Sequence, residues 1–220
     1  MFDAAFTCAP QKRDQDRGMK LTVFTGSIVD PAIGADAVVN ASNPDVILGS
    51  GVSGALREAC GGAAFQRELR EQLAQQFGSE LGPNDCLVTS AGSCRAFRWV
   101  LHVPAVDYRT RDPETGGPSG PGRIRSCMRA ALDAAEALAK RHDRGGRFVL
   151  ATPLLGAGAG GLGPMASLDA MLKAVSEYRA ASSSENETGL AKLVFVVLKA
   201  EDAQLVEREA QRHGLTVEKH

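Results

Sequence analysis

Two glycine-rich segments have the residue types and the spacing that bind phosphate. Residues 49–54 read GSGVSG and residues 156–161 read GAGAGG, so both match the pattern G-x-G-x-x-G. Each lies between a predicted strand and a predicted helix, and the N-terminus of a helix presents unpaired N–H groups that attract anions. Glycine also lets the backbone approach a phosphate without an intervening Cβ. We therefore predict two phosphate-binding loops, which together would suit a diphosphate.

A Rossmann domain that binds a dinucleotide is an alternative for either loop. That fold needs an acidic residue about 20 positions after the glycines, at the end of the next strand, to hold the ribose hydroxyls. Glu68 and Glu71 follow the first loop, and Glu177 follows the second, but all three lie in predicted helices. An NAD-dependent Rossmann-type oxidoreductase is therefore kept only as the less favoured alternative.

Apolar runs alternate with helical patterns from residue 20 onward. Strands are predicted at residues 21–24, 37–40, 86–90, 98–103, 148–152 and 192–198. Apolar residues recur every three or four positions, as in amphipathic helices, at residues 52–60, 65–77, 124–138, 168–178 and 205–210. Strands that alternate with helices of this length predict an α/β sandwich with a largely parallel or mixed sheet.

Composition and charge exclude several classes of protein. The 25 Lys plus Arg nearly balance 26 Asp plus Glu, so we expect no sequence-specific nucleic-acid binding through a basic face. No apolar run approaches the length of a membrane span. The five cysteines lack C-x-x-C spacing, which supports neither a zinc site nor a disulfide framework and predicts reduced thiols in the cytoplasm.

Two irregular segments, residues 109–123 and 182–189, are rich in Pro and Gly or in polar residues and are predicted to be surface loops. Neither divides the chain into halves that could each bury a core, so we expect one domain over residues 19–220, and a monomer. Residues 1–18 are polar and patternless in their second half and contain no signal-peptide core, which predicts a disordered extension.

These motifs resemble those of the macrodomain family, the α/β modules that bind ADP-ribose. Residues 38–43 (VVNASN) resemble the family's V-V-N-A-A-N, and residues 49–56 (GSGVSGAL) resemble its G-G-G-V-x-G-A-I. Residues 153–161 (PLLGAGAGG) are similar to its second loop, P-x-I-S-T-G-x-x-G, and residues 99–104 (WVLHVP) to its strand I-H-V-V-x-P. The resemblance spans roughly residues 20–200. It implies a three-layer α/β/α sandwich with a mixed sheet of about six strands, and ADP-ribose across the strands' C-terminal ends.

The resemblance also implies roles for individual residues. Asn43 would hydrogen-bond the distal ribose, Asn40 would help to set that loop, and Ile28 would lie beside the adenine. The residues that would line the distal ribose and the neighbouring phosphate are Gly49, Ser50, Gly51, Val52 and Ser53. The residues of the second loop that would hold the diphosphate are Leu155, Gly156, Ala157, Gly158, Ala159 and Gly160.

Four positions where the sequence departs from the family bear on function. Ser27 stands where the family's G-D-I has an Asp that accepts a hydrogen bond from adenine, and a hydroxyl accepts without bringing a charge. Ser53 stands where many hydrolytic members have the Asp of G-V-D-G. A second hydrolytic branch uses a lysine and an aspartate where this chain has Arg57 and Gly160.

Catalysis would then depend on Asn43 and on Asp45, a carboxylate on the following loop. Coronaviral macrodomains resemble this chain in lacking the G-V-D-G aspartate and are nonetheless hydrolases. We therefore predict a domain that binds ADP-ribose, or ADP-ribosyl groups on a protein or a nucleic-acid end, without a further cofactor or metal. Hydrolysis of the ADP-ribosyl linkage and non-catalytic reading both stay open.

Overall fold

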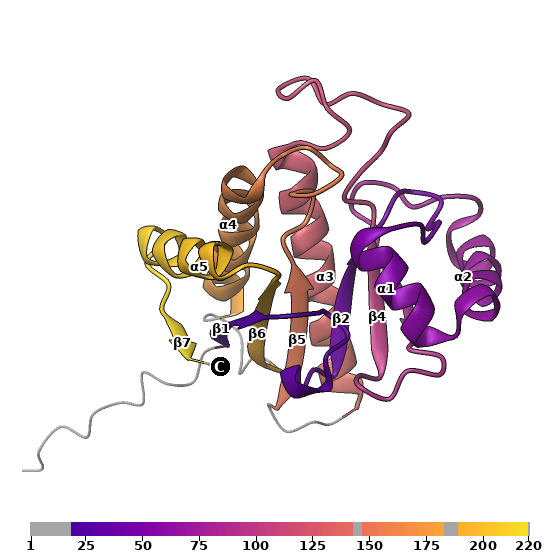
Figure 1. Ribbon diagram of the computed structural model, residues 1–220, viewed down its shortest axis with the longest axis horizontal. Helices are drawn as coiled ribbons and strands as arrows, with labels where there is room; N and C mark the ends of the chain where they lie inside the picture. The colour runs from indigo at the N-terminus through magenta and orange to yellow at the C-terminus, as the bar shows by residue number, and fades with distance from the viewer. Residues whose placement is uncertain (1–18, 143–146, 183–188, 220) are drawn as a thin grey trace, which may run out of the picture.

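A seven-stranded sheet forms the centre of the computed structural model, which describes residues 19–142, 147–182 and 189–219. Along the sheet the strands follow the order β3-β4-β2-β5-β6-β1-β7, as their labels show in Figure 1. Only the β3–β4 pair is antiparallel among these strands. The strands are β1 Lys20–Thr25, β2 Ala37–Ala41, β3 Leu87–Ser90, β4 Trp99–Val103, β5 Phe148–Pro153, β6 Leu190–Val197 and β7 Val217–Lys219.

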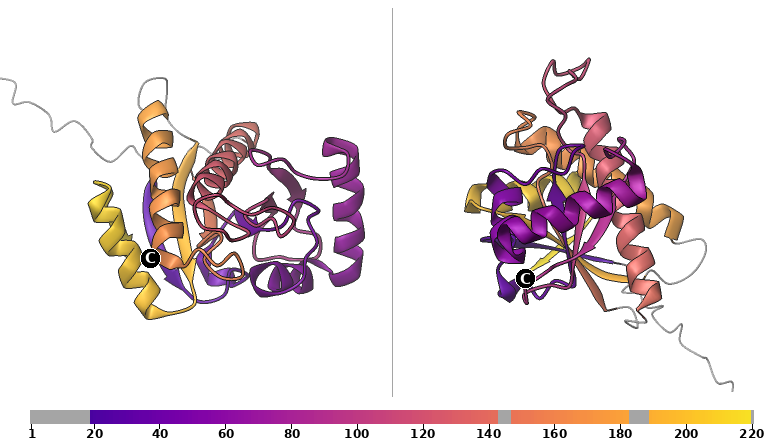
Figure 2. Two further views of the ribbon diagram at one scale, coloured as in Figure 1. Left: turned by 90° about the horizontal axis from the view of Figure 1, so that it is seen from above. Right: turned by 90° about the vertical axis from the view of Figure 1, so that its right-hand side faces the viewer.

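Five helices of the described chain cover the two faces of this sheet, as Figure 2 shows from two directions. On one face, α1 (Gly51–Cys60) and α2 (Gly62–Phe77) bury their apolar stripes in one hydrophobic cluster with the sheet. On the other face, α3 (Pro121–Arg141), α4 (Pro164–Ser182) and α5 (Ala200–Arg212) share a second, larger cluster. The predicted α/β/α sandwich with a mixed sheet is therefore confirmed.

The sheet has one strand more than the six or so that were expected. The additional strand, β7, has only three residues and pairs in parallel with β1, where Leu21 lies opposite Val217. A segment this short and polar, VEK, carries no alternating pattern that identifies a strand. The segment becomes a strand because it pairs with β1, and only the folded chain brings β1 next to it.

The strand order also excludes the Rossmann alternative. In a Rossmann sheet of order 3-2-1-4-5-6 the first two strands are neighbours. Here β5 and β6 separate β1 from β2. The glycine loops therefore belong to a different α/β topology.

The loops that follow the parallel strands meet at one edge of the sheet. Residues 104–120 follow β4, residues 42–50 follow β2, residues 154–163 follow β5 and residues 26–30 follow β1. Because β2 and β5 are hydrogen-bonded neighbours, with Val38 opposite Ala151, the two glycine loops emerge side by side. The loop after β4 projects furthest from this edge (Figure 1).

The predicted extension at residues 1–18 lies outside the described residues, as does most of the loop at 182–189. No helix in the described ranges is both long and apolar enough to cross a membrane. Among the cysteines that the structure describes, Cys60, Cys86, Cys94 and Cys127 are free thiols. Burial is the main cause that raises the pKa of Cys60 and of Cys127, each to about 12.

Candidate ligand-binding site

The second glycine loop presents a row of unpaired backbone donors. Within residues 154–163, Ala157, Gly161 and Leu162 donate their N–H groups to carbonyls of the same loop. No described residue accepts a hydrogen bond from the N–H groups of four further members, Gly156, Gly158, Ala159 and Gly160. Successive unpaired N–H groups form a concave site for an anion.

The shape of this loop requires glycine at its closing positions. A Cβ on Gly160 would lie 2.6 Å from the carbonyl oxygen of Gly156 and 2.9 Å from Cγ1 of Val106. Leu155 is fully buried, and its carbonyl accepts a hydrogen bond of 2.7 Å from Ser167 Oγ. A Cβ on Gly158 would instead meet no atom within 4 Å, so that side of the loop is open.

The first glycine loop leads into an uncapped helix. Ser50 is the N-cap residue of α1, and its side chain makes no capping hydrogen bond. The first bond that closes the helix runs from Gly54 N to Ser50 O, at 3.2 Å. In the described structure the N–H groups of Gly51, Val52 and Ser53 therefore have no acceptor, and they carry the positive end of the helix dipole.

A buried polar network holds this helix against the sheet. Asn40, which is fully buried, donates from Nδ2 to Nδ1 of His102 at 3.0 Å and accepts at Oδ1 from Ser53 Oγ at 2.8 Å. Because Nδ1 accepts, Nε2 of His102 carries the proton and donates to Thr89 Oγ1 at 3.1 Å. Burial lowers the pKa of His102 to about 3, so the ring is neutral.

This network decides what Asn40 and Ser53 can contribute to a ligand. Both Asn40 side-chain groups and the Ser53 hydroxyl are engaged inside the protein. Their side chains therefore fix the position of α1 on β2, and the group that Ser53 offers to a ligand is its backbone N–H. Both ring nitrogens of His102 are engaged, by Asn40 and by Thr89, so this histidine has a structural role.

Asn43 lies on the loop after β2 with its amide group oriented. Its Oδ1 accepts from Ile47 N at 2.9 Å, and its backbone carbonyl accepts from Val46 N at 3.0 Å. No described residue accepts from Asn43 Nδ2. The side chain therefore offers two N–H donors, suited to the oxygen of a sugar hydroxyl, from a half-buried position.

The Asn43 loop contains a strained residue, Val46, which is held in place by Gln66, and no pattern in the sequence indicates either role. Val46 has φ +49, which is unusual for a β-branched residue, and it is 1% exposed. Gln66 of α2 donates to Val46 O at 3.0 Å and accepts from Leu48 N at 2.8 Å. Backbone strain of this kind persists where surrounding contacts over-determine it. A buried glutamine in a polar-looking helix gives no sequence signal for such a role.

Asp45 belongs to an ion group centred on Arg109. Nη1 of Arg109 lies 3.8 Å from Asp45 Oδ1 and also contacts Glu80, while its Nε donates to Asp107 at 3.0 Å. Arg109 holds the pKa of Asp107 below its usual value, mainly through this side-chain hydrogen bond. Asp45 therefore already has a cationic partner, which a carboxylate that acts as a base would have to share.

The loop after β1 completes the row along the edge. Ile28 is 4% exposed and packs into the cluster under α1 and α2, while Ser27 is exposed. Asp30, three residues after Ser27, is the carboxylate nearest in sequence to the position where the resemblance led us to expect an Asp. Its Oδ1 accepts from Ala32 N at 2.9 Å and caps a short 3-10 helix, Pro31–Ile33. No cluster of three or more His, Cys, Asp or Glu that could hold a metal occurs in the part of the chain that the structure describes.

Comparisons of sequence give a family and several relatives. The Macro domain family model matches residues 39–171, more than half of the chain. A macro domain-containing protein of Streptomyces coelicolor is 32% identical over 121 residues, 55% of this chain and 66% of that protein. Another, of Caldanaerobacter subterraneus, is 38% identical over 84 residues, 38% of this chain and 45% of that protein. The chain thus matches about half to two-thirds of the length of these relatives.

A longer match, 27% identical over 197 residues, covers 90% of this chain and 97% of an Enterobacter protein named O-acetyl-ADP-ribose deacetylase. Solved structures share the fold. The Oceanobacillus iheyensis macrodomain with ADP superposes with a TM-score of 0.67 at 19% identity, over 87% of this chain and 90% of that one. The Trypanosoma brucei macrodomain in complex with ADP-ribose gives 0.62 at 20% identity, over 86% of this chain and 68% of that one.

Asn40→Ala is expected to destabilise the fold, because it leaves Nδ1 of buried His102 without a partner and leaves Ser53 Oγ only a longer bond of 3.3 Å to Ala41 O. An unsatisfied buried group costs about 1–3 kcal/mol, so we expect a loss of about 1–3 kcal/mol in the free energy of unfolding. Urea denaturation measures it, with Gln75→Ala on the exposed face of α2 as the control. A loss as small as that of the control would contradict the network.

The neutral state of His102 predicts a pH dependence. A histidine in the unfolded chain has a pKa of about 6.5, whereas folded His102 has a pKa of about 3. Between these values the unfolded chain binds a proton that the folded chain does not. The free energy of unfolding should therefore fall as the pH drops below about 6.5, by up to about 1.4 kcal/mol per pH unit from this residue.

Urea unfolding between about pH 5 and about pH 7 tests this dependence. His102→Gln should have a shallower pH slope than the unmodified protein. Gln75→Ala, a control on the exposed face of α2 that removes no titratable group, should keep the original slope. Equal slopes in all three proteins would show that His102 titrates normally.

Proposed function

This chain belongs to the Macro domain family, and on that premise we propose that it binds ADP-ribose, either free or attached to a target molecule. The observation that carries the proposal is the pair of adjacent loops with unpaired N–H groups. Three such groups lie at the start of α1 and four in the loop after β5. Two neighbouring sets of donors suit the two phosphates of a diphosphate.

The order of the strand ends supports the orientation of the ligand. From β1 to β2 the sheet crosses three strand spacings, or about 14 Å at about 4.8 Å each. We place the adenine beside Ile28 at the β1 end, the diphosphate over the glycine loops, and the distal ribose near Asn43. The solved macrodomains of the same fold whose ligands are ADP and ADP-ribose support this choice of ligand.

Hydrolysis is the second candidate function, favoured by the long alignment with the protein named O-acetyl-ADP-ribose deacetylase. In such a reaction Asn43 would hold the distal ribose or the attacking water through its free Nδ2. Asp45 would have to leave the influence of Arg109, which lies 3.8 Å away, to accept a proton. A reader that binds without hydrolysis needs no such change, so binding is the primary proposal.

Calorimetric titration and thermal shift test binding, and a product assay tests hydrolysis. ADP-ribose should bind and should raise the melting temperature in proportion to the logarithm of its concentration once the site is saturated. A stronger response to NAD than to ADP-ribose would overturn the proposal. Incubation with O-acetyl-ADP-ribose and with ADP-ribosylated protein then tests for release of product.

Asn43→Ala is expected to weaken ADP-ribose binding about threefold to tenfold, because the distal ribose loses one or two hydrogen bonds. Any release of product should stop. Isothermal titration and a product assay measure the two effects. Gln75→Ala, which lies on α2 away from the loops, serves as the control. If Asn43→Ala bound ADP-ribose as tightly as the unmodified protein does, the distal ribose would not lie near Asn43.

Gly158→Ala and Gly160→Ala form a matched pair in the second loop. A Cβ at position 158 meets no protein atom within 4 Å, so it should leave the free energy of unfolding within about 0.5 kcal/mol. It should nevertheless weaken ADP-ribose binding about tenfold or more, because the methyl group occupies the phosphate's space.

Gly160→Ala should instead destabilise the fold by about 1–3 kcal/mol, because its Cβ meets the backbone of Gly156. Chemical denaturation and titration of both variants give the comparison. If Gly158→Ala bound ADP-ribose as tightly as the unmodified protein does, the loop after β5 would not be the phosphate site.

A further inference from the structure

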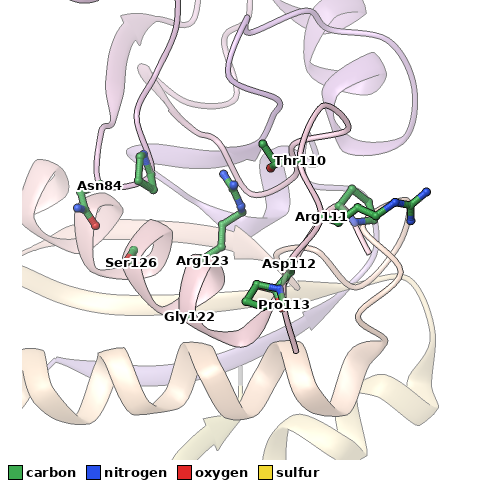
Figure 3. A pocket seen from close by; sticks show the side chains of 10 residues that line it. Asn84, Thr110, Arg111, Asp112, Pro113, Gly122, Arg123 and Ser126 are labelled. Atoms are coloured by element: carbon green, nitrogen blue, oxygen red, sulfur yellow. The ribbon is translucent and has the colours of Figure 1, made fainter. Parts of the chain in front are cut away.

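A pocket of about 330 Å³ lies at the same edge of the sheet, on the β4 side of the Asn43 loop. Its walls come from three places: residues 83–84 before β3, residues 110–118 after β4, and the first turns of α3. Figure 3 shows Arg123 extending from α3 toward the space between Asn84 and Thr110. None of these residues belongs to the glycine loops.

The pocket continues the row of subsites beyond the distal ribose. Leu81, two residues before the pocket wall, donates its N–H to Pro44 O at 2.9 Å, directly after Asn43. Arg109, adjacent to the wall residue Thr110, lies 3.8 Å from Asp45. In the binding mode proposed above, a group attached to the distal ribose near Asn43, on the side away from the diphosphate, would therefore be directed toward the pocket.

The lining of the pocket offers hydrogen-bond donors and a net positive charge. The side chains of Asn84, Thr110 and Ser126 make no hydrogen bond to any described residue. Arg123 is 21% exposed, and its guanidinium makes one long bond of 3.3 Å to Pro104 O. Such donors suit an oxyanion.

The charges of the lining agree with an anionic ligand. The lining contains two arginines, Arg111 and Arg123, and one carboxylate, that of Asp112. Oδ1 of Asp112 already accepts from the N–H groups of Glu114 and Thr115, at 3.0 and 3.1 Å. The second nearby carboxylate, Asp107, lies 3.9 Å from Arg123 but is held mainly by Arg109. The two arginines therefore keep donors for an incoming anion.

We propose that this pocket is an acceptor subsite, which binds an acidic side chain next to the modified residue of an ADP-ribosylated protein. It rests on the proposed function, since the ADP-ribosyl group brings the acceptor to this edge. A protein acceptor fits better than a nucleic-acid end. The pocket lining has two arginines against one aspartate, which suits a single carboxylate. Nucleic-acid binding depends on extended basic surfaces, and the chain as a whole carries a charge of −1.

The test compares two peptides with one ADP-ribosylated serine each, identical except for Glu or Gln two residues from that serine. The unmodified protein should bind the Glu peptide about threefold to tenfold more tightly, as one charge-assisted hydrogen bond allows. Arg123→Gln should reduce this preference to less than about twofold. The control is Arg125→Gln, the next arginine of α3, which pairs with Glu177 on α4 and should keep the preference.

Free ADP-ribose is titrated alongside, so the two proposals can fail separately. If the unmodified protein did not bind ADP-ribose, the proposed function would be wrong, and the acceptor subsite with it. If ADP-ribose bound but the two peptides bound equally, only the subsite would be wrong. The exposed Arg111→Gln provides a second variant if Arg123→Gln unfolds. A preference that persists in both, or tighter binding of an ADP-ribosylated oligonucleotide than of the Glu peptide, would also overturn the subsite.

Discussion

The parallel pairing of β2 with β5 is the constraint on which the rest of the site depends. Only a short stretch pairs, Ala37 with Leu150 and Val38 with Ala151, yet it places two loops that are distant in sequence at neighbouring positions. Each loop alone has free N–H groups and could hold one anion weakly. Side by side they form a continuous row of donors, with Asn43 at one end and Ile28 further along the edge. An anion bound there would be held by backbone amides, which agrees with the near-zero net charge of the chain.

Buried polar contacts beneath the loops keep that row in shape. Asn40 links α1 to β4 through Ser53 and His102, and every member of the network is at most 8% exposed. Gln66 similarly holds Val46 at a positive φ. These contacts replace water that the same groups would bind in the unfolded chain, so their main effect is on the uniqueness of the loop positions. A site made of backbone groups needs this support, because no side chain can adjust to correct a displaced loop.

Local patterns were enough to predict the class of fold, and they also supplied the candidate residues of the site. Apolar runs identified six of the seven strands, because a strand that is covered on both faces must be apolar along its length. The glycines at 156 and 160 marked a turn with no room for a Cβ. A Cβ on Gly156 would meet side-chain atoms of Ile124 and Ser119, and one on Gly160 would meet backbone atoms of Gly156, all at less than 3 Å. The VVNASN and GSGVSG motifs pointed to one family, which the family model confirms. These signals are local in the sequence, since each depends on residues within one or two turns of chain.

Tertiary structure alone decided which of these groups are free to bind a ligand and which are engaged inside the protein. Ser53 and Asn40 occupy motif positions, but their side chains are engaged with each other and with His102, which is distant in sequence. Asp45 lies close to Arg109 only because three loops meet at one edge. Gln66, Val46 and the pocket beside Arg123 carried no sequence signal. The physical reason is the same for each: a hydrogen bond or an ion pair depends on distance in space, and strand order sets that distance between segments that the sequence keeps apart.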